Sequence, residues 1–108
     1  MNKLPQLIAG YIDAANAQAP QRLAACFTPD ATVADEHALH RGRDEIEAWA
    51  HETGARYQAV IEPIDLEEAG GRHRLRAAVR GNFPGSPVTL HFDFRLASTG
   101  IESLEITP

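Results

Sequence analysis

The first part of the chain has apolar side chains at intervals of three and four residues, the spacing that places them on one face of a helix. One such stripe runs from about residue 4 to residue 17 and contains Tyr11. Pro20 is suited to open a second short helix, because the first helical position needs no amide hydrogen bond. Leu23 and Phe27 would form the buried side of that helix.

A third helix is predicted to follow Gly42, since apolar positions again recur at helical spacing. Gly54 is expected to end this helix in a left-handed cap. Two short strands are predicted between the second and third helices, at residues 31–36 and 38–41. The side chains expected on the buried face of the third helix are Ile46, Trp49, Ala50 and Thr53.

The second half of the chain alternates apolar and polar positions with a period of two, which is typical of strands with one buried face. The dipeptide at residues 70–71 is Gly-Gly and predicts a two-residue hairpin turn. The register set by this turn places Glu67 opposite Arg74 and Asp65 opposite Arg76. Opposite charges therefore face each other across the hairpin, which favours this register.

Pro63 interrupts this hairpin, because proline cannot donate a backbone hydrogen bond to a neighbouring strand. A bulge is therefore expected at this point. Beyond it, Ile61 would pair with Val79, and Tyr57 would pair with Phe83.

The segment from residue 88 to residue 96 has the clearest alternation in the chain. Its predicted inner face is apolar and its outer face is polar, as in a sheet that covers a core on one side. Pro84-Gly85 predicts a type II turn before this strand, and a three-residue turn at 98–100 would pair Phe94 with Leu104 and Phe92 with Ile106. Helices followed by antiparallel strands indicate an α+β fold.

The composition is consistent with one globular domain covering residues 1–108. The formal net charge of -5 argues against a nucleic-acid partner or an anionic membrane surface. Cys26 is the only cysteine, so no disulfide forms within the chain, and it is interpreted as a small buried side chain. Neither a secretory leader nor a long apolar run is evident, and a cytoplasmic location is expected.

Asp35 is the first candidate for chemistry. In the predicted strand it lies on the same side as Ala31 and Val33, which should face the core. A carboxylate among apolar side chains resists ionisation and becomes a stronger proton acceptor. Alternatively, Asp35 caps the hairpin or pairs with Arg41 or Arg43.

The order of motifs in the first half resembles the NTF2-like superfamily, particularly its SnoaL-like and ketosteroid isomerase-like members. The motifs are GYIDAAN on the first helix, the second helix ending near Phe27, then TPDATVAD, and GRDEIEAW opening the third helix. The resemblance implies a cone-shaped, curved antiparallel sheet with three N-terminal helices packed on its concave face. It also implies a pocket between the helices and the sheet, in a fold that hosts both enzymes and binding modules.

The resemblance assigns roles to residues of the first half. Asp35 occupies the position of the general base in the isomerases, and Tyr11 that of the tyrosine which donates a hydrogen bond to the substrate oxyanion. Tyr11 could instead be a core tyrosine bonded to a carbonyl or to Asp35. Phe92 occupies the position of the second oxyanion donor, while Asp93 is one residue away and would point to the other face. The oxyanion hole is therefore expected to be incomplete.

Other side chains could complete the site. In the predicted strand His37 lies on the same side as Asp35 and could form an acid–base pair with it. The alternative is that His37 is an exposed histidine of the turn. Candidates for contact with a flat, apolar substrate are Trp49, Tyr57, Phe92 and Phe94, with core packing as the other interpretation of Trp49. No histidine or cysteine spacing indicates a metal site, and no cofactor is expected.

Two hypotheses of function follow. In the first, the protein abstracts a proton next to a carbonyl of a small hydrophobic ligand, as an isomerase, cyclase or dehydratase would. In the second, it is a ligand-binding or dimeric interaction module without catalysis. In either case the polar outer face of the sheet is predicted to form a homodimer interface, because Asp93 faces Glu105 there and the pair requires a nearby cation.

Overall fold

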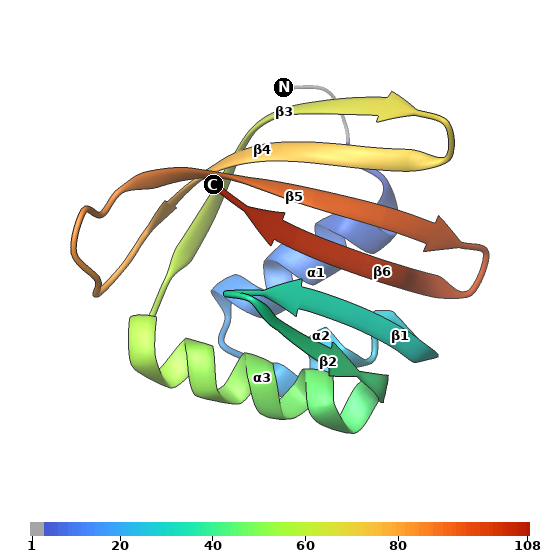
Figure 1. Ribbon diagram of the computed structural model, residues 1–108, viewed down its shortest axis with the longest axis horizontal. Coiled ribbons are helices and arrows are strands. Elements are labelled where there is room, and N and C mark those ends of the chain that lie inside the picture. The colour runs from blue at the N-terminus through green and yellow to red at the C-terminus, as the bar shows by residue number, and fades with distance from the viewer. Residues whose placement is uncertain (1–3) are drawn as a thin grey trace.

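The computed structural model describes residues 4–108 as three helices and a six-stranded curved sheet (Figure 1). The elements are α1 (Gln6–Asn16), α2 (Pro20–Ala24), β1 (Phe27–Asp35), β2 (Ala38–Arg41), α3 (Gly42–Tyr57), β3 (Val60–Ala69), β4 (Arg72–Arg80), β5 (Val88–Ala97) and β6 (Gly100–Thr107). The strand order is β2-β1-β6-β5-β4-β3. Neighbouring strands are antiparallel except β1 and β6, which are parallel. The α+β class and the NTF2-like arrangement are confirmed.

The predicted hairpin register is confirmed. Glu67 pairs with Arg74 and Asp65 pairs with Arg76, and the register shifts between Pro63 and Asp65 as expected from the proline. Ile61 is the partner of Val79 beyond the shift. The match arises because turn chemistry, charge pairing and the apolar alternation all favour one register.

The third helix is longer than predicted, because Gly54 does not end it. The helix continues to Tyr57, and Gln58 takes the left-handed conformation with φ of 47°. A glycine within a helix costs only about 1 kcal/mol. The added turn gains an ion pair between Arg56 and Glu52 and an edge-to-face contact between the rings of Tyr57 and Phe83. Tyr57 therefore meets Phe83 from a helix and not as a strand partner.

Two other boundaries differ from the prediction. Phe27 begins β1 and does not end the second helix, which stops at Ala24. The turn between β5 and β6 has two residues, since Ala97 pairs with Gly100, and the register shifts between Arg95 and Leu96. The predicted pairs of Phe94 with Leu104 and of Phe92 with Ile106 are nevertheless present, because this shift compensates for the shorter turn.

The core lies between the helices and the inner face of the sheet. Its largest fully buried side chains include Phe27, Phe94, Ile8, Ile46, Leu75 and Leu104. The side chain of Asn16 fastens α1 to the sheet, since its Nδ2 donates to the carbonyl of Ile61 at 3.0 Å and its Oδ1 accepts from the amide of Ile61 at 2.8 Å. This anchoring fixes α1, and with it Tyr11, above the strands.

Candidate functional site

A cavity of about 840 Å³ lies between the helices and the sheet. Its lining comes from α1, the loop to α2, the β1–β2 turn, α3, and strands including β5 and β6. The lining is mostly apolar, with a small number of polar side chains. Exposed lining residues such as Glu36, His37 and Leu39 place its mouth at the β1–β2 turn. A volume of several hundred Å³ with few polar groups is typical of small-molecule sites.

Asp35 lies in the cavity wall at the end of β1. Ala31 and Val33, on the same side of the strand, are fully buried, so the alternation carries Asp35 to the inner face. Burial raises the pKa of Asp35, and the neighbouring charge of Glu36 adds to this. A hydrogen bond from the indole of Trp49 opposes the increase, because it stabilises the ionised form.

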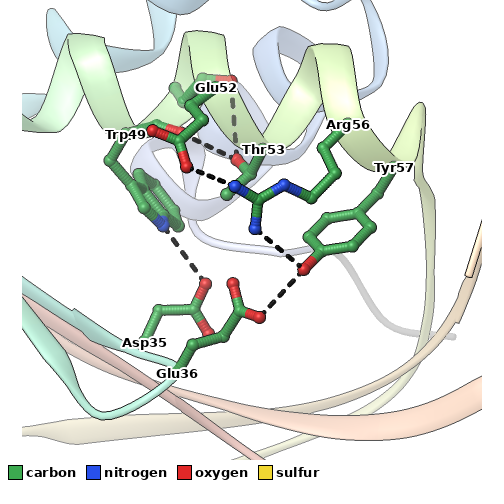
Figure 2. A network of polar contacts seen from close by, with 8 residues as sticks. Asp35, Glu36, Trp49, Glu52, Thr53, Arg56 and Tyr57 are labelled. Atoms are coloured by element: carbon green, nitrogen blue, oxygen red, sulfur yellow. Dashed lines mark hydrogen bonds and ion pairs between the residues drawn. The ribbon is translucent and has the colours of Figure 1, made fainter.

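The bond from Trp49 also orients the Asp35 carboxylate. Trp49 Nε1 donates to Oδ2 of Asp35 at 3.1 Å, from the middle of α3 across to the end of β1 (Figure 2). Within residues 4–108 no other side chain donates a hydrogen bond to Asp35. The indole of Trp49 therefore holds one oxygen of the carboxylate, and the backbone amide of Glu36 adds a further hydrogen bond to the same carboxylate.

Tyr11 lies in the cavity wall on α1 and is only 2% exposed. Its ring packs among Phe27, Phe92 and Phe94, with ring centroids 5.5 to 6.4 Å apart. Burial raises the pKa of Tyr11 strongly, and the negative charge of Asp35 raises it further. In the described part of the chain its hydroxyl has no hydrogen-bond partner. Tyr11 is thus a neutral phenol whose donor is not used within residues 4–108.

His37 does not continue the strand as the sequence pattern predicted. The strand ends at Asp35, and Glu36 and His37 form a two-residue turn with φ of 51° and 64°. His37 is exposed at the cavity mouth, and no hydrogen bond joins it to Asp35 among the described residues. His40 is the histidine that lies near the acid: its ring is 6.0 Å from that of Trp49, and its charge lowers the pKa of Asp35.

Three of the four aromatic side chains expected to contact a substrate line the cavity, namely Trp49, Tyr57 and Phe92. Phe94 does not, because its ring lies beneath Tyr11 at 5.5 Å in an edge-to-face contact and belongs to the core. Trp49 is 9% exposed, in agreement with core packing, and its indole also reaches Asp35, while its contact with a substrate stays a prediction.

A chain of polar contacts at the cavity mouth was not anticipated from the sequence. The hydroxyl of Tyr57, the last residue of α3, donates to Oε2 of Glu36 at 2.9 Å (Figure 2). Arg56 approaches the same hydroxyl at 3.5 Å and pairs with Glu52 at 2.7 Å. In a strand that continued past Asp35, Glu36 would point to the opposite face, and only the tight turn brings it toward α3. Because the helix was predicted to end at Gly54, Tyr57 was not expected on α3, where it contacts Glu36.

The described residues contain no group of three histidine, cysteine, aspartate or glutamate side chains arranged to hold a metal ion. Nor is any helix within residues 4–108 long and apolar enough to cross a membrane. Among the described side chains that line the cavity, Asp35 and Tyr11 are the two whose pKa is raised.

Residues 8–100 match the family of SnoaL-like domains. The chain belongs to this family. A solved structure of a proposed polyketide cyclase from Sinorhizobium meliloti is 38% identical, with a TM-score of 0.92, and the match covers 96% of this chain and 95% of that one. No curated protein matches the chain in sequence.

Two more distant solved structures share the fold. A hypothetical protein with a ketosteroid isomerase-like fold from Catenulispora acidiphila, solved in complex with trimethylamine, is 21% identical with a TM-score of 0.87, covering 98% of this chain and 87% of that one. The epoxide hydrolase/cyclase-like enzyme SalBIII, which acts in pyran ring formation in salinomycin, is 18% identical with a TM-score of 0.82, covering 94% and 87%.

Proposed function

We propose that this SnoaL-like protein abstracts a proton next to a carbonyl group in a small, apolar, cyclic or carbonyl-containing substrate. The observation that carries the proposal is the pairing, in one cavity, of a half-buried carboxylate with a raised pKa and a neutral phenol with an unused donor. The 38% identical relative, itself a proposed polyketide cyclase, supports this class of chemistry.

In the proposed mechanism Asp35 is the general base. The oxygen that Trp49 does not bind accepts the proton from carbon, while Trp49 holds Oδ2 in place. As the proton leaves, negative charge develops on the carbonyl oxygen. The hydroxyl of Tyr11 donates a hydrogen bond to that oxygen. The surrounding aromatic rings exclude water, which strengthens this hydrogen bond. His37, at the mouth, is proposed as an auxiliary acid for groups that remain near solvent.

The decisive experiment is hydrogen–deuterium exchange at carbon. The protein is incubated in D₂O with a series of cyclic ketones, and loss of the proton signal next to the carbonyl is followed by NMR. Exchange faster than with buffer alone supports the proposal. Tight binding of the ketones without exchange would favour the alternative, a ligand-binding module in which Asp35 and Tyr11 serve only to position the ligand.

Isomerisation of β,γ-unsaturated ketosteroids is expected to be weak. Phe92 lines the cavity, and the family resemblance assigns it the position of the second oxyanion donor, yet a phenyl ring cannot donate a hydrogen bond. Loss of one such donor typically slows a reaction about 100- to 1000-fold. A spectrophotometric assay of the conjugated product checks this, with Phe92→Asp expected to raise the rate. Turnover comparable to that of efficient enzymes would contradict the assignment of Phe92.

We also propose a homodimer formed through the outer face of the sheet. Asp93 and Glu105 are paired there, as predicted, and Arg74 approaches Asp93 at 3.5 Å. Arg95 on the same face is exposed and able to meet a carboxylate of a second copy. Light scattering at micromolar concentration should give twice the monomer mass, and Arg95→Glu should reduce it. A monomeric wild-type protein under these conditions would rule the interface out.

A further inference from the structure

Among residues 4–108, the side chains that line the cavity include carboxylates but no lysine or arginine. Asp35 and Glu36 both line it at the β1–β2 turn, and among the described lining residues the only basic side chains are two histidines. All the arginines of the sequence lie within residues 4–108, so their absence from the described wall reflects placement and not composition. Four of them lie on the outer-facing positions of β4, on the opposite side of the sheet.

The negative charge at the mouth is also fixed in position. The hydroxyl of Tyr57 donates a hydrogen bond to Oε2 of Glu36 at 2.9 Å (Figure 2). This bond positions the carboxylate without the help of a cation. Arg56 feels the charge of Glu36, but it lies outside the cavity lining and pairs with Glu52 at 2.7 Å. The described lining therefore carries three carboxylates, Asp35, Glu36 and Glu105, against two histidines and no lysine or arginine.

We infer that the cavity selects apolar ligands without negative charge, and that Glu36 is a specificity-determining residue that disfavours carboxylates and phosphates. The inference rests on the proposed function in taking this cavity as the ligand site. Like charges a few ångströms apart repel strongly beside apolar walls, where the effective dielectric constant is well below that of water. Repulsion of the wrong ligand is a common source of specificity.

The test uses two probes of one shape, methyl 2-naphthoate and 2-naphthoate, with the full-length protein at neutral pH. Trp49 is the only tryptophan, so its indole N–H signal in ¹⁵N-resolved NMR reports binding beside Asp35. The ester should bind at least about tenfold more tightly than the carboxylate. Glu36→Gln should reduce the ratio of the two affinities several-fold, because glutamine can still accept the hydrogen bond of Tyr57 but carries no charge.

Glu47→Gln is the matched control, because Glu47 is exposed on α3 outside the cavity and the substitution changes the net charge equally. It should leave the ratio unchanged. Equal affinity for the two probes, an unchanged ratio in Glu36→Gln, or no shift of the Trp49 signal with either probe would overturn the inference. Ester preference without carbon exchange would refute only the proposed function, and exchange without ester preference would refute only this inference.

Discussion

Replacing Asp35 with asparagine is expected to abolish carbon–hydrogen exchange while leaving the fold intact. The amide cannot accept the proton, and general-base catalysis typically contributes about 100- to 10,000-fold to a rate. The substitution keeps the shape of the side chain, and its oxygen can still accept the hydrogen bond that Trp49 donates to Asp35. Exchange rates by NMR and unfolding in urea measure the two effects on the same sample.

The expected effect on stability follows from the direction of the pKa shift. Burial raises the pKa of Asp35 in the folded protein above the value of about 3.9 in an unfolded chain. Between these two values the folded state binds more protons, so the free energy of unfolding falls as the pH rises through this window and stays lower at neutrality. Below the unfolded value both states are protonated and the penalty disappears.

Asp35→Asn should therefore be as stable as wild type or slightly more stable at neutral pH, and this difference should shrink on acidification. Asp13→Asn serves as the control, since Asp13 is an exposed carboxylate on α1 outside the cavity. It should change neither exchange nor the pH dependence. A strongly destabilised Asp35→Asn would show that Asp35 is a structural partner in an ion pair or hairpin cap, and normal exchange in this variant would show that Asp35 is not the base.

The inward direction of Asp35 could be predicted from the alternation of side chains along β1. Ala31 and Val33 are apolar and buried, and side chains in a strand alternate between its two faces. Asp35, two residues after Val33, therefore points to the same inner face. The hairpin at residues 70–71 was equally well determined, since its turn, its charges and its apolar face favour one register. These are local rules acting within a few residues of each other.

The features of the site that could not be predicted lie where a strand or a helix ends. His37 shares the parity of Asp35 only if the strand continues, and the left-handed turn at Glu36 and His37 ends it. The cap at Gly54 failed for a related reason: packing of Tyr57 against Phe83 sustains the helix for another turn. The contact between Tyr57 and Glu36 requires both events, so no single segment of the sequence indicates it.

Tyr11→Phe is expected to slow carbon exchange about 100- to 1000-fold, the usual effect of losing one oxyanion donor. It should change stability little, because phenylalanine fills the same place among Phe27, Phe92 and Phe94. Within residues 4–108 the hydroxyl has no partner to lose. Since the pKa of Tyr11 is raised far above its ordinary value, the phenol stays neutral, and the pH profile of exchange should show only the rise due to Asp35.

The second tyrosine of the chain provides a matched control for this substitution. Tyr57 also lines the cavity, but its hydroxyl already donates to Glu36, so it is not free to stabilise an oxyanion. Tyr57→Phe should therefore slow exchange far less than Tyr11→Phe at saturating ketone, where the rate reports the chemical step. Equal effects of the two substitutions would contradict the role of Tyr11 as the donor. A Tyr11→Phe protein that exchanges normally would assign Tyr11 to the core and leave Asp35 without a partner in catalysis.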